Sequence, residues 1–172
     1  MKILVFADFH GSVGSLNRAM EISKREKPNK TVVCGDLFGW SHPKEVAELV
    51  QQLDGVLYLV KGNNDFDTAQ SFLPYAMEDS ALMYHFNRKL FFTHGDRYNS
   101  MRVSPILNEG DVLVHGHTHV GRLRVCNGLF VCNVGSLARP RDGVASYLTL
   151  DEQGATLKQA DGEVLQQLNW EQ

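Results

Sequence analysis

The first half of the chain alternates short apolar runs with segments whose apolar side chains recur every three or four residues. Three of the runs have the length of strands covered on both faces, namely residues 3–7, 31–34 and 56–60. Helices are expected between them, the first capped by Ser15 and the second beginning at Pro43. This order of strand, helix, strand, helix, strand predicts a parallel sheet with right-handed crossovers.

The second half of the chain predicts further strands joined by turns. The expected strands are residues 82–86, 89–93, 111–114, 122–126, 129–132, 145–150, 155–160 and 163–168. Asn127-Gly128 is a strong two-residue hairpin signal, and the last three strands are expected to form a meander. Two long stretches, 66–80 and 97–110, lack a regular pattern, and the second has room for a short helix. Loops of this length are more often functional than idle.

Five of the predicted strands end in side chains that bind metal ions well. These side chains are Asp8 and His10, Asp36, Asn63, His94, and His117 and His119. In open α/β sheets, ligands bind in the crevice beyond the carboxyl ends of the strands, so distant residues can meet there. Helix capping by Asp8 or turn formation at Asp36 and Asn63 would explain single positions, but five separate local reasons are less economical than one shared site.

The segment from His115 to His119 carries three imidazoles at alternate positions. Residues two apart in an extended segment point the same way, so His117 and His119 are able to flank a common point. Gly116 leaves the backbone free to bend there. We expect His115 to turn away from that point and to form hydrogen bonds beside the site.

The composition and charge of the chain limit the classes of function that it can have. With 172 residues, we expect one domain over residues 1–172. The hydrophobic fraction of 43% and the charged fraction of 22% are those of ordinary globular proteins. A formal net charge of −3 argues against binding long nucleic acids through a broad basic face. Cys34, Cys126 and Cys132 are expected to be free thiols. With neither a signal peptide nor a membrane span predicted, the expected location is the cytoplasm.

The mixture of donor types indicates the metals. Imidazole, carboxylate and amide oxygen together suit Mn²⁺, Fe²⁺, Zn²⁺ or Co²⁺ without deciding among them. Of these ions and Ni²⁺, we expect Mn²⁺. Seven donor residues exceed the four of a tetrahedral zinc site, which suggests two divalent ions that share a carboxylate. Such a pair, about 3.5–4 Å apart, acidifies a bridging water and clamps an in-line displacement at phosphorus. This chemistry is the hydrolysis of a phosphate ester.

The order of the motifs resembles the signature of the calcineurin-like metallophosphoesterase superfamily. The matching motifs are Asp8-x-His10, Gly35-Asp36, Gly62-Asn63-x-Asp65, His94-Gly95 and Gly116-His117-x-His119. The short chain, Thr93-His94-Gly95 and Asn133-x-Gly135-Ser136 are similar to the small YfcE-type phosphodiesterase branch. The resemblance implies a four-layer α/β/β/α sandwich, in which two mixed β-sheets are flanked by helices. It also implies a homo-oligomer.

The resemblance implies a role for each matching residue. One metal would be held by Asp8, His10, Asp36 and His119, and the other by Asp36, Asn63, His94 and His117, so that Asp36 bridges. A metal-bridging hydroxide would attack the phosphodiester in line, which makes Asp36, Asn63 and His94 catalytic. Asp65 would join them by orienting a ligand or the substrate.

Asn64 marks a departure from the wider superfamily. Protein-phosphatase members carry a histidine after the metal-binding asparagine, whereas the Asn64 amide is able to bind substrate but not to supply a proton. We therefore expect small phosphodiesters as substrates. Arg139 and Arg141 are equally explained as a phosphate clamp or as solvated surface residues. For Trp40, packing is favoured over stacking on an organic leaving group.

Two other functions stay open at this point. One is a phosphomonoesterase or a nuclease that acts on short nucleotides. The other is a non-catalytic protein-interaction scaffold of the retromer-small-subunit type, whose metal site is degraded. The presence of every ligand residue in this sequence favours the enzyme. No membrane partner is expected.

Overall fold

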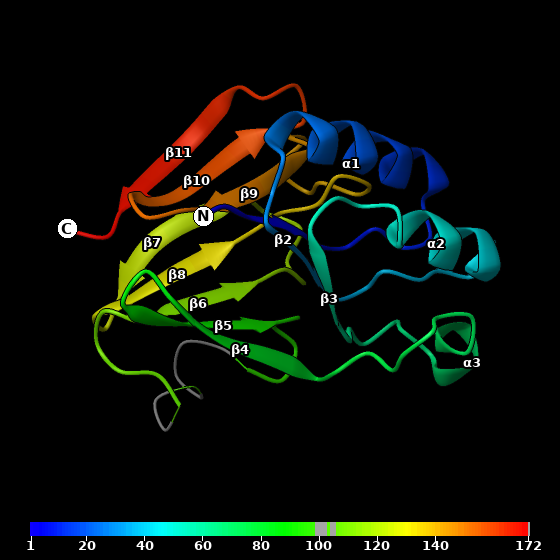
Figure 1. Cartoon of the computed structure of the whole chain (residues 1–172), viewed down its shortest axis with the longest axis horizontal. Helices are drawn as coiled ribbons and strands as arrows, with labels where there is room; N and C mark the ends of the chain where they lie inside the picture. Colours follow the sequence, from blue (N-terminus) through cyan, green and yellow to red (C-terminus); the bar gives the residue numbers. More distant parts are fainter. Residues whose placement is uncertain (99–102, 104–105, 172) are drawn as a thin grey trace.

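Two β-sheets packed face to face form the centre of the computed structural model, which describes residues 1–98, 103 and 106–171 (Figure 1). The six-stranded sheet has the order β11-β10-β9-β1-β2-β3. Its strands are β1 (Ile3–Phe6), β2 (Lys30–Cys34), β3 (Val56–Val60), β9 (Ser146–Leu150), β10 (Gly154–Gln159) and β11 (Val164–Asn169). The five-stranded sheet has the order β4-β5-β6-β8-β7. Its strands are β4 (Ser80–His85), β5 (Arg88–Thr93), β6 (Val112–His115), β7 (Arg122–Cys126) and β8 (Leu129–Asn133).

The six-stranded sheet contains the predicted parallel unit. β1 pairs in parallel with β2, and β2 with β3, while β9 adds the meander antiparallel to the other side of β1. β3 departs from expectation because it is not covered on both faces, and Val56 is 58% exposed. The physical reason is its position as the outermost strand of the sheet.

The five-stranded sheet is mixed, as predicted. β5, β6 and β8 are parallel, and the antiparallel strands β4 and β7 close its edges. Asn127 and Gly128 have φ angles of 51° and 74°, as a two-residue hairpin turn requires. In the β4–β5 hairpin, the residues with positive φ are Phe86 and Asn87, one position earlier than expected.

Three helices lie on the side of the six-stranded sheet: α1 (Val13–Glu26), α2 (Pro43–Val50) and α3 (Asp67–Gln70) (Figure 1). Their apolar side chains share a core cluster with the outer face of that sheet. The expected cap of α1 is wrong, since Ser12 is the N-cap residue and its side chain accepts a hydrogen bond from the Ser15 backbone nitrogen. Ser12 lies nearer the strand exit, so the helix gains a further turn.

A separate apolar cluster covers the outer face of the five-stranded sheet. Val103 and Leu107 pack there against Phe91, Leu113 and Val131. Residues from the 97–110 stretch thus form the outer layer on this side. The short helix considered within that stretch falls partly on 99–102 and 104–105, which lie outside the described residues. Within the described part of the chain, no helix has both the length and the apolarity needed to cross a membrane.

Candidate metal centre

Five loops at the carboxyl ends of the strands bring the predicted ligands together. Asp8 follows β1, Asp36 follows β2 and Asn63 follows β3 in one sheet, while His94 follows β5 and the last two histidines follow β6 in the other. Five of these residues adopt left-handed backbone conformations, with φ between 48° and 67°: Asp8, His10, Asp36, His117 and His119. This conformation is uncommon for residues other than glycine and clusters at functional sites. Nothing in the sequence pattern indicated it.

The first donor group consists of Asp8, His10 and His119. The His119 Nε2 atom lies 3.4 Å from Asp8 Oδ1 and 3.1 Å from His10 Nε2. His119 Nδ1 donates to the Arg139 carbonyl oxygen at 2.9 Å, which leaves Nε2 as the ring nitrogen that faces the group. Fixing one ring nitrogen through a backbone carbonyl is how proteins orient metal-binding histidines.

The second donor group consists of Asp8, Asp36 and His94. His94 Nδ1 donates to the Cys34 carbonyl oxygen at 3.0 Å, so its Nε2 atom faces Asp36 Oδ2 at 3.4 Å. Two further predicted ligands meet this nitrogen, with Asn63 Oδ1 at 3.0 Å and His117 Nδ1 at 3.1 Å. The geometry therefore gathers all seven predicted ligands into two adjoining groups.

Asp8 is the carboxylate common to both groups, whereas the expected bridge was Asp36. Asp36 Oδ2 also lies 3.6 Å from His10 Nε2, so its carboxylate reaches the first group as well. Both acids thus lie between the two sets of histidines.

The Asp8 carboxylate shows that this arrangement fits a cation. Its Oδ2 atom accepts a hydrogen bond from the His117 backbone nitrogen at 2.9 Å. Its Oδ1 atom is buried and has no hydrogen-bond partner among the described residues. Burial raises the pKa of Asp8 to about 7, against the opposing effect of His94. An unpaired carboxylate oxygen surrounded by imidazole nitrogens is the environment that a divalent cation stabilises.

The other titratable groups respond to burial and to one another. Burial favours the neutral form of Asp36, but hydrogen bonds and charge from His94, together with Asn64, hold its pKa well below the usual range. Burial likewise opposes charging of His94, yet Asp36 raises the pKa of His94 to about 9. Burial lowers the pKa of His10 to about 4. These opposite shifts within one site are typical of functional centres.

Two predicted residues orient the ligands from behind. The Asp65 carboxylate accepts hydrogen bonds from the backbone nitrogens of Phe38 and Gly62, each at 2.8 Å, and so ties the loops after β2 and β3 together. The Asn64 backbone nitrogen and side-chain amide donate to the two oxygens of Asp36 at 2.8 and 2.7 Å. The Asn64 amide is thus engaged by Asp36 in this structure, and its predicted contact with substrate stays a prediction.

Close packing of glycine backbones makes room for these acids. A Cβ atom on Gly62 would collide with the backbone and carboxylate of Asp36, and one on Gly116 would collide with the Asp8 carboxylate. Both glycines thus allow a loop from one strand to approach an acid on another.

The remaining candidates lie around the centre. The guanidinium groups of Arg139 and Arg141 are exposed, although the Arg139 carbonyl and Arg141 nitrogen both bond His119. His115 is half-buried and contacts the Gly116 carbonyl at 3.1 Å, apart from both donor groups, as expected. A residue whose role was missed is Ser136, which donates to the Asp8 carbonyl oxygen at 2.8 Å. Only its occurrence in the Asn133-x-Gly135-Ser136 motif hinted at a role.

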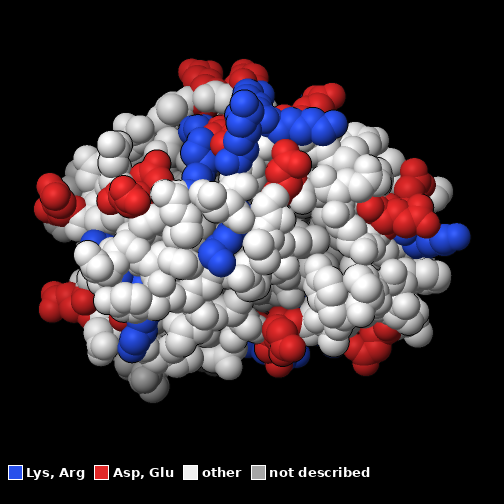
Figure 2. Space-filling model, viewed as in Figure 1, with Lys and Arg blue, Asp and Glu red and all other residues white. Residues whose placement is uncertain are grey.

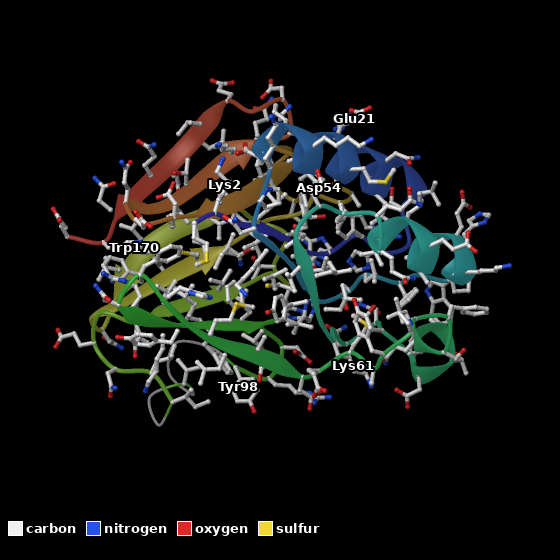
Figure 3. All side chains as sticks on the ribbon, viewed as in Figure 1. Lys2, Glu21, Asp54, Lys61, Tyr98 and Trp170 are labelled. Atoms are coloured by element: carbon white, nitrogen blue, oxygen red, sulfur yellow. The ribbon has the colours of Figure 1, made fainter. Side chains whose placement is uncertain are left out.

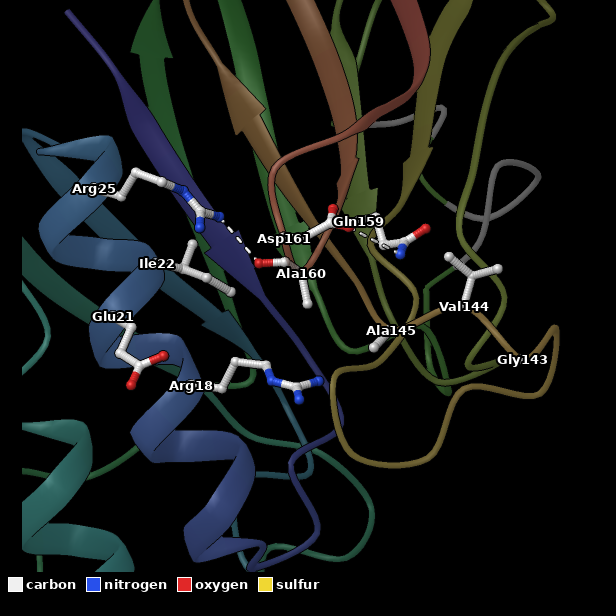
Figure 4. Close-up of a pocket in the computed structure, with 10 residues that line it drawn as sticks. All are labelled: Arg18, Glu21, Ile22, Arg25, Gly143, Val144, Ala145, Gln159, Ala160 and Asp161. Carbon is white, nitrogen blue, oxygen red and sulfur yellow. Dashed lines mark hydrogen bonds between the residues drawn. The ribbon is translucent and has the colours of Figure 1, made fainter.

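Trp40 contradicts the sequence prediction. Packing was favoured, but its side chain is 92% exposed. It lines a cavity of about 550 Å³ beside the loops that carry Asp36 and Asn63. A second cavity of about 510 Å³ lies between α1 and the loops near Ala145 and Ala160, and none of the predicted ligands lines it (Figure 4).

Figure 2 shows how the charged side chains are distributed over one face of the molecule. Lys and Arg side chains gather over α1 beside Asp and Glu, and most of the remaining surface in this view is uncharged (Figure 2). This distribution agrees with the formal net charge of −3.

Comparison with known proteins defines the class. The family model for the calcineurin-like phosphoesterase superfamily domain matches residues 1–155, and the chain belongs to this superfamily. Phosphodiesterase YfcE of Escherichia coli strain K12 is 30% identical over 165 residues, with 88% of each chain covered. The solved structure of YfcE from E. coli, described as a phosphoesterase, matches with a TM-score of 0.90 at 27% identity and covers 98% of this chain and 99% of that one.

A more distant match concerns the fold alone. Vps29 from Entamoeba histolytica, solved in complex with Zn²⁺, matches with a TM-score of 0.70 at 18% identity and covers 99% of each chain. The predicted family and its two-sheet architecture are thereby confirmed. The helical outer layer is sparse, since all three described helices lie on one side.

Proposed function

We propose that this chain is a single-domain phosphodiesterase that uses two divalent metal ions, with Mn²⁺ favoured. The observation that carries the proposal is the buried Asp8 Oδ1 atom, which lacks a hydrogen-bond partner and belongs to both donor groups. The family and the similarity to phosphodiesterase YfcE confirm the coarser prediction, a metal-dependent phosphoric diester hydrolase.

Each ligand residue has a defined task in this proposal. The first donor group, extended by Asp36, would hold one ion, and the second, extended by Asn63 and His117, would hold the other. Bound divalent cations supply an acidified water and neutralise the negative charge of the phosphate. Cys34 and Arg139, through their carbonyl oxygens, keep the two buried imidazoles in the required tautomer.

Diesters with good leaving groups are the proposed substrates. The position after Asn63 carries Asn64, which has no proton to give at neutral pH and is bound to Asp36. A leaving oxygen that departs as a stable anion needs no acid, whereas an alkoxide does. Arg139 is proposed to contact the phosphate, since its main chain borders His119.

Hydrolysis of bis(p-nitrophenyl) phosphate by the metal-loaded protein tests the proposal. The metal-stripped protein should be inactive, and added Mn²⁺ should restore turnover with two ions bound per chain by elemental analysis. A monoester and a short single-stranded DNA serve as the alternative substrates. Turnover that persists in both Asp36→Asn and His117→Ala would overturn the proposal. Tight metal binding without hydrolysis of any ester would favour the scaffold function.

A further inference from the structure

An exposed aromatic cavity adjoins the metal centre. It measures about 550 Å³, and its lining includes Gly39, Trp40, Pro43, Phe66, Ala69 and Phe72. Its lining residues come from the loop before α2, the start of α2, and the segment 66–72 that contains α3. Both helices lie on the right in Figure 1. We name it the Trp40 pocket.

Chain connectivity places this pocket at the rim of the centre. Gly39 follows Asp36 by three residues, and its α-carbon is packed against the His10 carbonyl group, so that a Cβ atom there would collide with it. Phe66 follows Asn63 by three residues and adjoins Asp65, whose carboxylate fixes the same loop. Two walls of the Trp40 pocket are therefore direct continuations of ligand loops.

The aromatic side chains of the pocket are exposed without a packing role that explains them. Trp40 is 92% exposed and Phe66 is 47% exposed, and their ring centroids are 5.4 Å apart at an interplanar angle of 44°. Phe72, on the same cavity, is also 47% exposed. An exposed apolar patch beside polar groups typically marks a binding surface. Rings in such a cluster favour a flat apolar group between or against them.

The residues that line this pocket give a phosphate no positive charge to bind, whereas the metal centre is proposed to hold cations. No Lys or Arg lines the pocket among the described residues, and its one carboxylate, Asp67, is paired with Lys61 at 2.8 Å. The loop of Arg139, which does not line the pocket, borders His119 in the first donor group. A substrate with one anionic and one apolar part therefore has one favoured orientation, with the anionic part at the metal centre and the apolar part in the Trp40 pocket.

We propose that the Trp40 pocket binds an aromatic ester group of the diester while the phosphate lies at the metal centre. This inference rests on the proposed function and narrows its substrate class to diesters that carry at least one aryl or heteroaryl group. Trp40 and Phe66 are then specificity-determining residues that act through stacking.

Steady-state kinetics with bis(p-nitrophenyl) phosphate provides the first test. Trp40→Ala and Phe66→Ala should each raise KM about 10-fold, in line with the loss of one stacked ring. Inorganic phosphate, which has no ring, should inhibit these variants and the parent protein with inhibition constants that agree within about 2-fold. Tyr84→Ala, which removes a 68% exposed aromatic side chain on β4, is the matched control and should leave KM unchanged. If Trp40→Ala and Phe66→Ala kept the KM of the parent protein, as Tyr84→Ala is expected to do, the proposed role of the pocket would be refuted.

Tryptophan fluorescence provides a test that needs no hydrolysis. The chain has two tryptophans, and Trp170 is 7% exposed and lies at the opposite side of the molecule from α3 (Figure 3), so acrylamide quenching reports mainly on Trp40. Diphenyl phosphate should protect the fluorescence from quenching, whereas dimethyl phosphate at equal occupancy of the centre should not. Trp40→Phe should abolish the protected signal.

The two tests separate this inference from the proposed function. Protection by diphenyl phosphate without turnover of any diester would support the Trp40 pocket and contradict the proposed phosphodiesterase. If the protein hydrolyses diesters, but the Trp40→Ala and Phe66→Ala variants keep the parent KM and diphenyl phosphate does not protect the fluorescence, the phosphodiesterase is supported and the role of the pocket is refuted.

Discussion

A buried acid lies near each end of β1: Glu26, at the end of α1, bonds Lys2 before the strand, and Asp8 follows the strand. The hydrogen bonding of the two carboxylates differs. At the amino end, Glu26 accepts hydrogen bonds from Lys2, Lys158 and Tyr147 at 3.0, 2.8 and 2.7 Å. At the carboxyl end, Asp8 leaves one oxygen without a partner among the described residues. Burial favours the neutral form of both, but the three donors hold the pKa of Glu26 at about 2, while that of Asp8 rises to about 7.

This difference in hydrogen bonding distinguishes Glu26, an acid that stabilises the fold, from Asp8, a proposed metal ligand. A buried carboxylate whose acceptor sites are filled by donors from distant strands contributes to folding. One whose acceptor site is left open costs stability and is kept where a cation can occupy it. Four predictions test this contrast.

The largest effect is expected from Asp8→Asn. The amide keeps the size of the side chain but removes the charge common to both donor groups, so turnover of bis(p-nitrophenyl) phosphate should fall by on the order of 10³-fold. The metal-free variant should unfold at the same temperature as the parent or higher, because an unfavourable buried charge is gone. A melting temperature lowered by several degrees would show that the Asp8 carboxylate stabilises the metal-free fold, contrary to this prediction.

Gly116→Ala should weaken metal binding by about 10- to 100-fold, as loss of correct ligand orientation does. The added Cβ atom would press on the Asp8 carboxylate and displace it. Competition with a chromogenic chelator measures the affinity. Gly14→Ala is the control, since a Cβ atom there meets nothing within 4 Å inside α1, and it should leave the affinity unchanged.

Glu26→Gln should lower the free energy of unfolding by about 2 kcal/mol, because the ammonium groups of Lys2 and Lys158 lose their charged acceptor. Chemical denaturation measures this, and turnover should stay intact. Glu21→Gln, on the exposed side of α1, should change stability by less than about 0.5 kcal/mol. An inactive Glu26→Gln variant would show that the two ends of β1 are coupled.

The smallest effect concerns pH. The pKa of Glu26 lies near 2 in the folded chain and near 4.5 when unperturbed, so its stabilising contribution is complete above about pH 4.5 and is lost as the pH falls toward 2. The stability difference between the parent protein and Glu26→Gln should therefore shrink across this window. Denaturation curves at pH 5 and pH 3 measure it. A constant difference would mean that the carboxylate is not the source of the stabilisation.

Much of the fold was predictable because hydrophobic period and turn chemistry are local. The expected strands match the observed ones to within two residues, and Asn127-Gly128 forms its hairpin. The exposure of β3 was not predictable, because it depends on which strand lies at the edge of the sheet. The cap at Ser12 was missed because Ser15 has the same local chemistry.

The ligand residues were predictable because each follows a strand and has the right donor type. Their geometry was not, since it arises between segments more than a hundred residues apart. The contact of Asp8 with His117, the engagement of Asn64 by Asp36 and the exposure of Trp40 all depend on tertiary packing. No local pattern records such contacts.

The position of β1 between β2 and β9 has a consequence for synthesis of the protein. Every proposed ligand has been translated once His119 emerges, but the strand that bears Asp8 still lacks its second neighbour until residues 146–150 follow. The framework that aligns the donors is thus completed late, by strands that contribute none of them. On the ribosome, a nascent chain that stops short of this meander holds all the proposed ligands, but its larger sheet still lacks β9, β10 and β11.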